Sequence, residues 1–492
     1  MPSEDRLDSA PQTPLPDAPP AVSSWASRLV ALAVASALLM EFIDSTALST
    51  ALPTLARGFH VDPIHLKLAL TSYILALAVF VPVSGWAAEK FGARRVFLAA
   101  MAVFLIGSAL CGLSRTLTEL VGARIIQGMG GAMMTPVARL IVVGQAPREQ
   151  LLRAMGWFVM PALIGPLIGP PLAGFVLSVA DWPWIFYLNL PVGLLGMVAV
   201  MRFVPPIKSP DPGPFDWLGF FLAASAISGI VAVAETGGLS IIPPVWQAVL
   251  VAASLAAAFA YVRFSRRKAR PILDLGLLRY KTLRASLVGG TFVRLGIGAG
   301  PFLMPLLLQV GMGWTPLQAG SVTLAGGLGV LGARPFAGAI LKRVGFRTAL
   351  CVFLVVSSVM IAAPAAFRIG TPAPLIMGLL LFGGFFRSSQ FIAANTIAYA
   401  DVPDRSVAAA STLSAVTQQV GLALGISFGG LMLHFARGGA DGALTPDRFT
   451  LPYIAIGAVT LMALPFYLGL DKDAGANLSG HKGATSAGAE KI

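Results

Sequence analysis

Charge is scarce in this sequence. Only 12% of its 492 residues are Asp, Glu, Lys or Arg, while 56% are hydrophobic. A soluble domain usually carries about a quarter of its residues as charged ones. A soluble fold of this composition could not cover its own surface with polar groups, so we expect much of the surface to face lipid.

Residues that support catalysis or metal binding are also few. The chain has four histidines and two cysteines, and it contains no GxxxxGK[ST] phosphate loop, no HExxH zinc motif and no CxxC pair. These absences argue against ATP hydrolysis by this chain as an energy source, against the common metal sites and against enzyme activity. Cys111 and Cys351 lie inside apolar runs, where free cysteine behaves as a small core residue. We expect no cofactor and no metal.

The net charge of +13 would suggest nucleic-acid binding in a soluble protein. Here the basic residues occupy short gaps between apolar runs, which is typical of the loops that orient a membrane protein. We therefore expect membrane lipid, and no nucleic acid, around this chain.

Apolar runs of bilayer length recur along the chain, since a helix needs roughly 20 apolar residues to cross the hydrocarbon core. They lie at residues 29–56, 66–87, 94–113, 119–143, 152–179, 183–204, 215–235, 244–264, 285–310, 316–341, 347–367, 374–398, 405–435 and 449–470. The sequence thus predicts an all-α polytopic membrane protein with fourteen transmembrane helices.

Basic loops predict the orientation of these helices. Every second loop is rich in Lys and Arg, among them Arg148 and Arg270, whereas the alternate loops carry isolated charges such as Arg57 and Lys67. We expect both termini in the cytoplasm. Residues 1–27, which are Pro-rich, and 471–492, which are rich in Gly, Ala and Ser, are predicted to be disordered tails.

One internal repeat marks two halves. The segment GWAAEKFGAR, from Gly85, corresponds to GAILKRVGFR, from Gly338, at an offset of 253 residues. Parallel repeats of this kind build many secondary transporters. The repeat predicts a six-helix bundle at 28–204, a second at 285–470, and two inserted helices with a basic loop at 205–284.

Two carboxylates, Glu41 and Asp44, fall in the middle of the first predicted helix. A carboxylate at bilayer depth is expensive and usually faces an interior cavity. Spacing i, i+3 predicts both on one helix face, where burial and a like-charged neighbour favour the protonated form. We expect the pair to carry protons; the alternative is that one carboxylate merely pairs with a basic residue to hold the bundle.

Arg124 and Gln127 have the same spacing on the helix predicted at 119–143. A buried arginine cannot shed its proton, so Arg124 needs a carboxylate, carbonyl groups or water. We expect it to pair with Asp44 or Glu41 in one state and to release it in another. A permanent structural ion pair is the alternative.

Further intramembrane polar residues are candidates for a substrate cavity with Gln127. Arg294 precedes a stretch dense in Gly and Pro, which predicts a bent or interrupted helix beside a binding site; otherwise it snorkels from the cytoplasmic end. For Gln309, Gln390 and Asn395 the alternative is a hydrogen bond that packs helices together.

The helix predicted at 152–179 contains Gly165, Pro166, Gly169, Pro170 and Gly174. Small residues let helices approach closely, and prolines remove backbone hydrogen bonds. We expect a bending element beside a gate, with a kinked structural helix as the alternative.

These motifs resemble the major facilitator superfamily, specifically its fourteen-helix drug:proton antiporter branch. GWAAEKFGARR is similar to the helix 2–3 signature, although Glu89 stands where the signature has aspartate. IDSTALSTALP is similar to the helix 1 motif, ARIIQGMGGA to the helix 4 motif, IGPLIGPPLAG to the helix 5 antiporter motif with Pro170 in place of a small residue, and DWPWIFYLNLPVG to the junction of helices 5 and 6. The resemblance covers roughly residues 28–470.

The resemblance implies roles for these residues. It puts Asp44 at the acidic position of helix 1 and Arg124 at the arginine linked to proton coupling. It also implies a cytoplasmic gate made by Gly85, Glu89, Gly92, Arg94 and Arg95.

The function that follows is proton-coupled antiport, with export of amphipathic organic compounds by alternating access. The location implied is the bacterial cytoplasmic (inner) membrane, and the form a monomer; nothing in the sequence encodes a contact with a periplasmic adaptor. Two alternatives stay open. One is a narrow-range metabolite transporter of the same fold, and the other is a membrane sensor that kept the fold and lost transport.

Overall fold

The computed structural model describes residues 24–145, 151–206, 213–237, 243–268, 271–438 and 442–479. Most of the two predicted tails, and the loop residues Arg148 and Arg270, lie outside these ranges. Within them the regular structure is entirely helical, because a backbone in lipid must satisfy its own hydrogen bonds.

Long helices follow the predicted apolar runs closely. They are α1 (Ser24–Phe59), α2 (Lys67–Phe91), α3 (Ala93–Leu113), α4 (Leu117–Gln145), α5 (Leu151–Val179), α6 (Trp184–Tyr187) with α7 (Asn189–Phe203), α8 (Trp217–Thr236), α9 (Pro244–Ser265), α10 (Lys281–Arg284) leading to α11 (Gly290–Pro305), α12 (Pro316–Ala362), α13 (Ala373–Ile397), α14 (Val407–Arg437), α15 (Thr450–Leu461) with α16 (Leu464–Leu468), and the short α17 (Ala476–Ser479). Thirteen segments of the described chain are long and apolar enough to cross a membrane.

Helix α12 accounts for the difference between thirteen and fourteen. Its 47 residues include Gly345, whose φ of 76° and ψ of 165° are not helical. At 1.5 Å per residue the whole of α12 would be about twice as long as the hydrocarbon core is thick. Two spans therefore meet at Gly345, as the separate runs at 316–341 and 347–367 predict.

Gly345 also ties the structure to the internal repeat. Its counterpart in the first half is Gly92, which separates α2 from α3 with a φ of 89°. Both glycines adopt a left-handed backbone that other residues rarely take. The repeated segment thus makes the same sharp connection between two membrane helices in each half.

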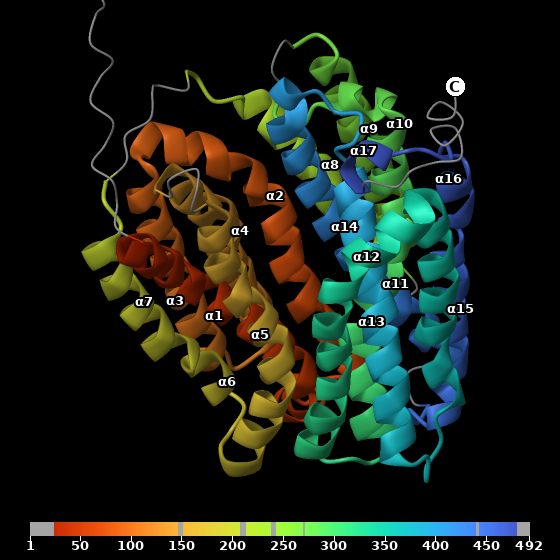
Figure 1. The fold of residues 1–492 in the computed structure, drawn as a ribbon. Coiled ribbons are helices and arrows are strands. Elements are labelled where there is room, and N and C mark those ends of the chain that lie inside the picture. The colour runs from red at the N-terminus through yellow and green to blue at the C-terminus, as the bar shows by residue number, and fades with distance from the viewer. Residues whose placement is uncertain are drawn as a thin grey trace, which may run out of the picture.

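The helices form two bundles side by side (Figure 1). Helices α1 to α7 pack together on the left of the view, and α11 to α16 on the right. The inserted helices α8 and α9 pack on each other, and α8 also contacts α2 and α14. Only 22% of the apolar window of α8 and 11% of that of α9 is buried, so most of this inserted pair faces lipid.

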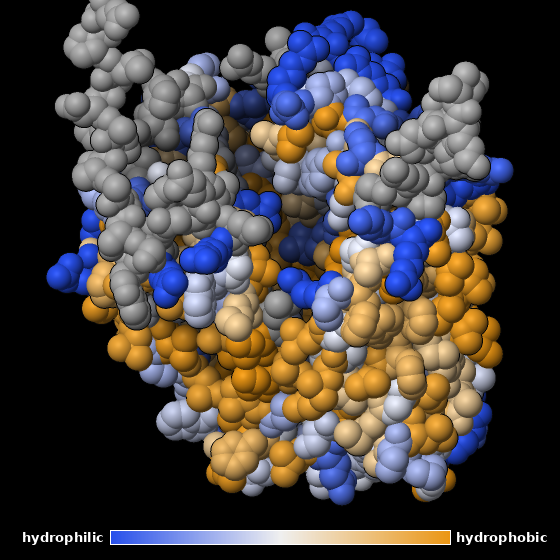
Figure 2. All heavy atoms as spheres, in the orientation of Figure 1, coloured by the Kyte–Doolittle hydropathy of each residue, from blue (hydrophilic) through white to orange (hydrophobic). Residues whose placement is uncertain are grey.

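The bundles touch at one end, which we call the closed end: the end at which α1 finishes and α12 begins. There the Nε2 of Gln309 donates to the carbonyl of Thr50 at 2.8 Å, and Gly174 of α5 lies against the backbone of Pro316. At the opposite, open end the surface is hollowed between the bundles, with hydrophilic residues in the hollow (Figure 2). The start of α1 lies toward this open end.

Candidate functional site

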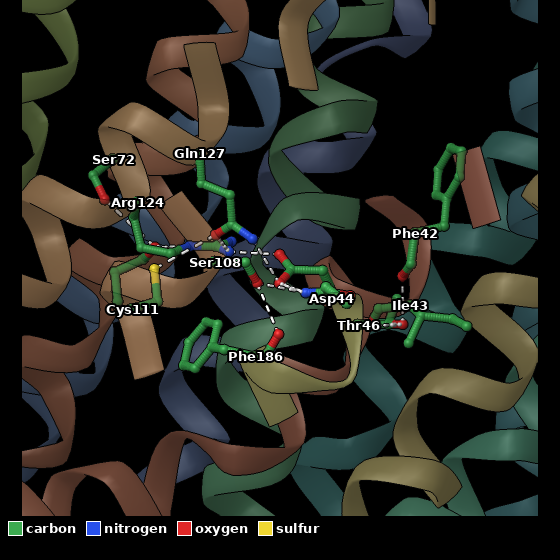
Figure 3. A network of polar contacts seen from close by, with 12 residues as sticks. Phe42, Ile43, Asp44, Thr46, Ser72, Ser108, Cys111, Arg124, Gln127 and Phe186 are labelled. Carbon is green, nitrogen blue, oxygen red and sulfur yellow. Dashed lines mark hydrogen bonds and ion pairs between the residues drawn. The ribbon is translucent and has the colours of Figure 1, made fainter. Parts of the chain in front are cut away.

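A buried carboxylate, Asp44 of α1, lies at the centre of the first bundle (Figure 3). Its side chain accepts three hydrogen bonds: from Nη1 of Arg124 at 2.5 Å, from Nε2 of Gln127 at 2.9 Å and from Nδ2 of Asn189 at 2.8 Å. Asp44 and Arg124 are each 1% exposed. Of the two carboxylates that the sequence offers to Arg124, the structure therefore brings Asp44 to it.

The guanidinium of Arg124 has other acceptors besides Asp44. Its Nη1 also donates to Oε1 of Gln127 at 2.6 Å, and its Nε donates to the carbonyl of Ala69 at 3.2 Å. The ring of Tyr73 lies 4.2 Å from the guanidinium carbon, a favourable cation–π distance. Four residues thus hold the arginine in place, and only one of them, Asp44, is acidic.

The network extends to residues that sequence reasoning missed. Asn189, the first residue of α7, donates from the same amide nitrogen to Asp44 and to Oγ of Ser108 at 2.9 Å, and Ser108 donates to the carbonyl of Phe186. The junction motif DWPWIFYLNLPVG contains Asn189, so the motif was the available signal. What it did not indicate is that this amide reaches back to α1.

Close helix packing brings these side chains together. Cβ atoms built on Gly107 of α3 and Gly130 of α4 would come within 2.5 Å of backbone nitrogens on the facing helix, those of Gln127 and Phe104. Because no side chain separates the backbones, α3 and α4 approach closely. That approach carries Gln127 and Arg124 inward to α1.

Glu41 has different surroundings from Asp44, although both face α4 as their spacing predicts. Its Oε2 accepts one hydrogen bond from Oγ1 of Thr135 at 3.1 Å, and the residue is half-buried. Among the described residues no basic group pairs with it. Glu41 lies one turn nearer the open end than Asp44. The two carboxylates thus share one face of α1, as their spacing predicts, but they have different hydrogen-bond partners.

In the second bundle Arg294 is also buried, at 3% exposure. It forms two long hydrogen bonds, to the carbonyl of Ser286 at 3.4 Å and to Oδ1 of Asn395 at 3.5 Å, and its Nε has no partner in the described structure. Ser286 belongs to a π-helical turn, Ala285–Gly289, a feature frequent at functional sites. The alternative in which Arg294 snorkels to water does not fit this burial.

Gln390 and Gln309 have separate places. Gln390 of α13 is fully buried with both amide atoms unpartnered in the described structure. Gln309 lies on a second π-helical turn, Leu306–Gly311, at the closed end, where it borders a cavity of about 550 Å³ that Arg57 and Trp314 also line. The predicted substrate residues thus fall in three places and not in one: Gln127 in the Asp44 network, Gln309 at the closed end, and Arg294 with Asn395 and Gln390 in the second bundle.

The gate residues surround the Gly92 turn. Arg94 donates from Nη2 to the carbonyl of Met201 on α7 at 2.6 Å, a contact within the first bundle. Glu89 and Arg95 are exposed, and a Cβ on Gly85 would meet open space. In this form of the molecule, Glu89 makes no hydrogen bond or ion pair with the second bundle among the described residues.

Helix α5 lies between the bundles. Gly165 and Gly169 pack on α1 at Phe42 and Thr46, while Gly174 packs on Pro316. The carbonyl of Pro170 lies against Gly320 of α12, and α5 is continuous through Pro166 and Pro170. The small residues of α5 thus allow close contact with α1 on one face and with the second bundle on another.

Among the described residues no group of three or more His, Cys, Asp or Glu is arranged to hold a metal ion. The polar groups that the described structure does bring together interact by ion pairing and hydrogen bonding, in two repeated halves that meet at one end.

Comparison with known proteins agrees with this architecture. A model of the Major Facilitator Superfamily matches residues 34–265 and 286–490. A Pectobacterium carotovorum protein provisionally named multidrug resistance protein MdtD is 35% identical over 438 residues, which is 88% of this chain and 93% of that protein. A Klebsiella pneumoniae protein of the same name is 34% identical over 455 residues, 90% of this chain and 95% of that one.

A solved structure of a POT family transporter in complex with 5-aminolevulinic acid has the same fold. It has a TM-score of 0.66 and 16% identity, and the match covers 89% of this chain and 95% of that chain. The fold, the repeat and the relatives define a multi-pass membrane protein of the transporter class. The chain belongs to the Major Facilitator Superfamily.

Proposed function

We propose that this chain is a proton-coupled antiporter that exports amphipathic organic compounds from the cytoplasm by alternating access. The observation that carries the proposal is the ion pair of Asp44 and Arg124, buried at bilayer depth. Ionisable residues there are costly and mark proton relays and substrate pathways. Relatives named for multidrug resistance, at 34 to 35% identity, support the substrate class.

The basic loops assign the open end to the cytoplasm, so the form described here is inward-open. In this form Asp44 is the ionised partner of Arg124. At the closed end the bundles meet along two seams, α2 against α14 and α5 against α12. Conversion to the outward-open form requires these seams to separate, which gives external protons a path to α1. Location in a bacterial inner membrane and a monomeric state belong to the same proposal.

A proton that adds to the Asp44 carboxylate converts it to a neutral acid and removes the charge that faces Arg124. Arg124 then keeps its contacts with Gln127, Ala69 and Tyr73, so the arginine does not have to leave the bundle. Glu41, one turn nearer the open end and without a basic partner among the described residues, is the next group along the path to the cytoplasm. We assign Glu41 the exchange of this proton against the entering substrate.

The test is transport in proteoliposomes that contain the purified chain and an imposed pH gradient, with ethidium as the probe. The wild-type chain is expected to transport ethidium only when the gradient is present. Asp44→Asn should reduce that transport at least tenfold, whereas Glu119→Gln, an exposed carboxylate on α4, should not. Gradient-driven transport that persists in a folded Asp44→Asn chain would remove the coupling role.

One observation favours the narrow-range alternative. Arg124 of the first bundle is a buried cation with a carboxylate partner, but Arg294 has no carboxylate partner among the described residues. A buried charge is normally paired, and a guanidinium suits a carboxylate or phosphate. A substrate with one anionic group would supply that partner.

A substrate panel separates the two candidates. If Arg294 binds an anionic group of the substrate, Arg294→Gln should lower the transport of carboxylate-bearing amphiphiles at least tenfold. The transport of ethidium should stay within about twofold of the wild-type rate. Arg294→Lys should keep part of the activity toward the carboxylate-bearing compounds. An equal loss for both classes of compound would assign Arg294 to structure and not to specificity.

A further inference from the structure

The inserted helix α8 is joined to both bundles by a buried polar cluster at the closed end. We call Lys67 of α2, Glu235 of α8 and Ser427 of α14 the closed-end triad. Lys67 and Ser427 are fully buried, and Glu235 is 5% exposed. The sequence had suggested that Lys67 is an isolated loop charge; it is instead the first residue of α2, turned into the protein.

Each member contacts Glu235 directly. The Nζ of Lys67 donates to the backbone carbonyl of Glu235 at 2.9 Å and lies 3.4 Å from its Oε2. The Oγ of Ser427 donates to Oε1 of Glu235 at 2.5 Å. One residue of the insertion therefore binds the first bundle through an ion pair and the second through a hydrogen bond.

The surrounding helix leaves space for this arrangement. A Cβ added to Gly430 of α14 would come within 2.7 Å of Cδ of Lys67. The lysine stem thus crosses the seam between α2 and α14 where α14 has no side chain. Any larger residue at 430 would push Lys67 away from Glu235.

A buried ion pair contributes little net stability, because desolvation offsets most of the attraction. Its best-attested use is to specify one arrangement of packed elements over another. Here the arrangement specified is the one in which α2 packs against α14, and these helices belong to different bundles. Helix α8 has few other anchors, because most of its surface faces lipid.

From this geometry we infer that the closed-end triad makes the inserted helix pair part of the conformational cycle, by holding α2 and α14 together in the inward-open form. The inference rests on the proposed function in one respect, namely that the two bundles alternate. When the closed end opens, Glu235 has to part from Lys67 or from Ser427. The inserted helices then move with one bundle, and Lys67, Glu235 and Ser427 are positioning residues for that step.

Two further contacts cross between the bundles near the triad. Nη1 of Arg437 on α14 pairs with Asp62, just before α2, and Gln309 bonds to Thr50. Neither includes the insertion, and the Arg437–Asp62 pair is partly exposed. The triad differs from both because it is buried and because it alone, within the described chain, links α8 to the two bundles by polar contacts.

The test is the labelling rate of a reporter cysteine, measured without substrate or gradient. Thr50→Cys is placed in a full-length chain that carries Cys111→Ser and Cys351→Ser, because Thr50 is 3% exposed at the closed end. The purified chain, in nanodiscs, is treated with a maleimide. Lys67→Met with Glu235→Gln removes both charges together, so no buried charge is left unpaired. This double variant should label at least tenfold faster than the parent.

Two controls sharpen the result. Ser427→Ala removes only the contact with the second bundle and should accelerate labelling about threefold. If the double variant does not fold, the labelling rate of Ser427→Ala tests the inference in its place. Lys268→Gln removes the exposed pair with Asp216 at the other end of α8 and should leave the rate unchanged. Parental labelling rates in folded triad variants would overturn the inference. Because the assay uses no gradient, a failure of proton coupling would leave its outcome unaffected.

Discussion

The carboxylate of Asp44 and the guanidinium of Arg124 meet inside the first bundle, 2.5 Å apart, although 80 residues separate them in the chain. Their helices, α1 and α4, are not consecutive, so the pair exists only in the folded bundle. Removing one partner leaves the other charged and almost without water. Such a change is strongly destabilising, whereas removing both charges together costs less.

Asp44→Asn is therefore expected to lower the free energy of unfolding by about 3–5 kcal/mol, the usual cost of an orphaned buried charge. Asp44→Asn combined with Arg124→Gln should recover at least half of that loss, while transport stays absent. Thermal unfolding in detergent checks both values. If the double variant is less stable than Asp44→Asn, the pair is not the reason for the loss.

Glu41→Gln should separate coupling from stability. Its carboxylate has a single neutral partner, Thr135, and a glutamine can keep that hydrogen bond, so the unfolding free energy should change by about 1 kcal/mol or less. Gradient-driven efflux should fall at least tenfold. Thr135→Val is the matched control, because it removes the hydrogen bond and keeps the carboxylate; it should retain most of the efflux.

Gly130→Ala should be destabilising because its Cβ would come within 2.5 Å of the backbone nitrogen of Phe104. Overpacking of this kind typically costs about 1–3 kcal/mol. Gly122→Ala, on the same helix but facing open space, should stabilise slightly, since alanine favours a helix over glycine. The difference in melting temperature between these two variants measures the α3–α4 contact. Equal melting temperatures would mean that the helices can separate without cost.

The repeated glycines make a paired prediction. Gly92→Ala and Gly345→Ala force a Cβ into a left-handed backbone, which costs roughly 1–2 kcal/mol each. Gly85→Ala and Gly338→Ala, at the preceding glycines of the same repeat, meet nothing within 4 Å and should be neutral or slightly stabilising, as for Gly122→Ala. Thermal unfolding of the four variants would show the same order in both halves. A large effect in one half only would argue that the two turns are not equivalent.

Much of the fold follows from the sequence because lipid imposes a simple rule. Each span must be about 20 apolar residues long, so the runs at 316–341 and 347–367 correctly divide α12 at Gly345, where the backbone is not helical. The partners of Arg124 were limited in the same way, because few carboxylates lie at bilayer depth.

What the sequence could not predict depends on contacts between distant helices. Lys67 looks like a loop charge because it precedes an apolar run, and its burial depends on Glu235, 168 residues away. Gln309 is predicted to line the same cavity as Gln127 and Arg294, but its position along the chain places it at the closed end, where it borders a separate cavity. Asn189 reaches Asp44 because α7 packs against both α1 and α3. Periodicity carries no information about such pairings.

The inserted helix α8 makes the two sides of the molecule unequal. The bundles meet along two seams, α2 against α14 and α5 against α12. Helix α8 contacts both helices of the first seam, and within the described residues it is absent from the second. If the chain exports lipophilic compounds as proposed, we therefore expect them to enter from the bilayer along the α5–α12 seam, past the glycines and prolines of α5, and not along the seam that α8 covers.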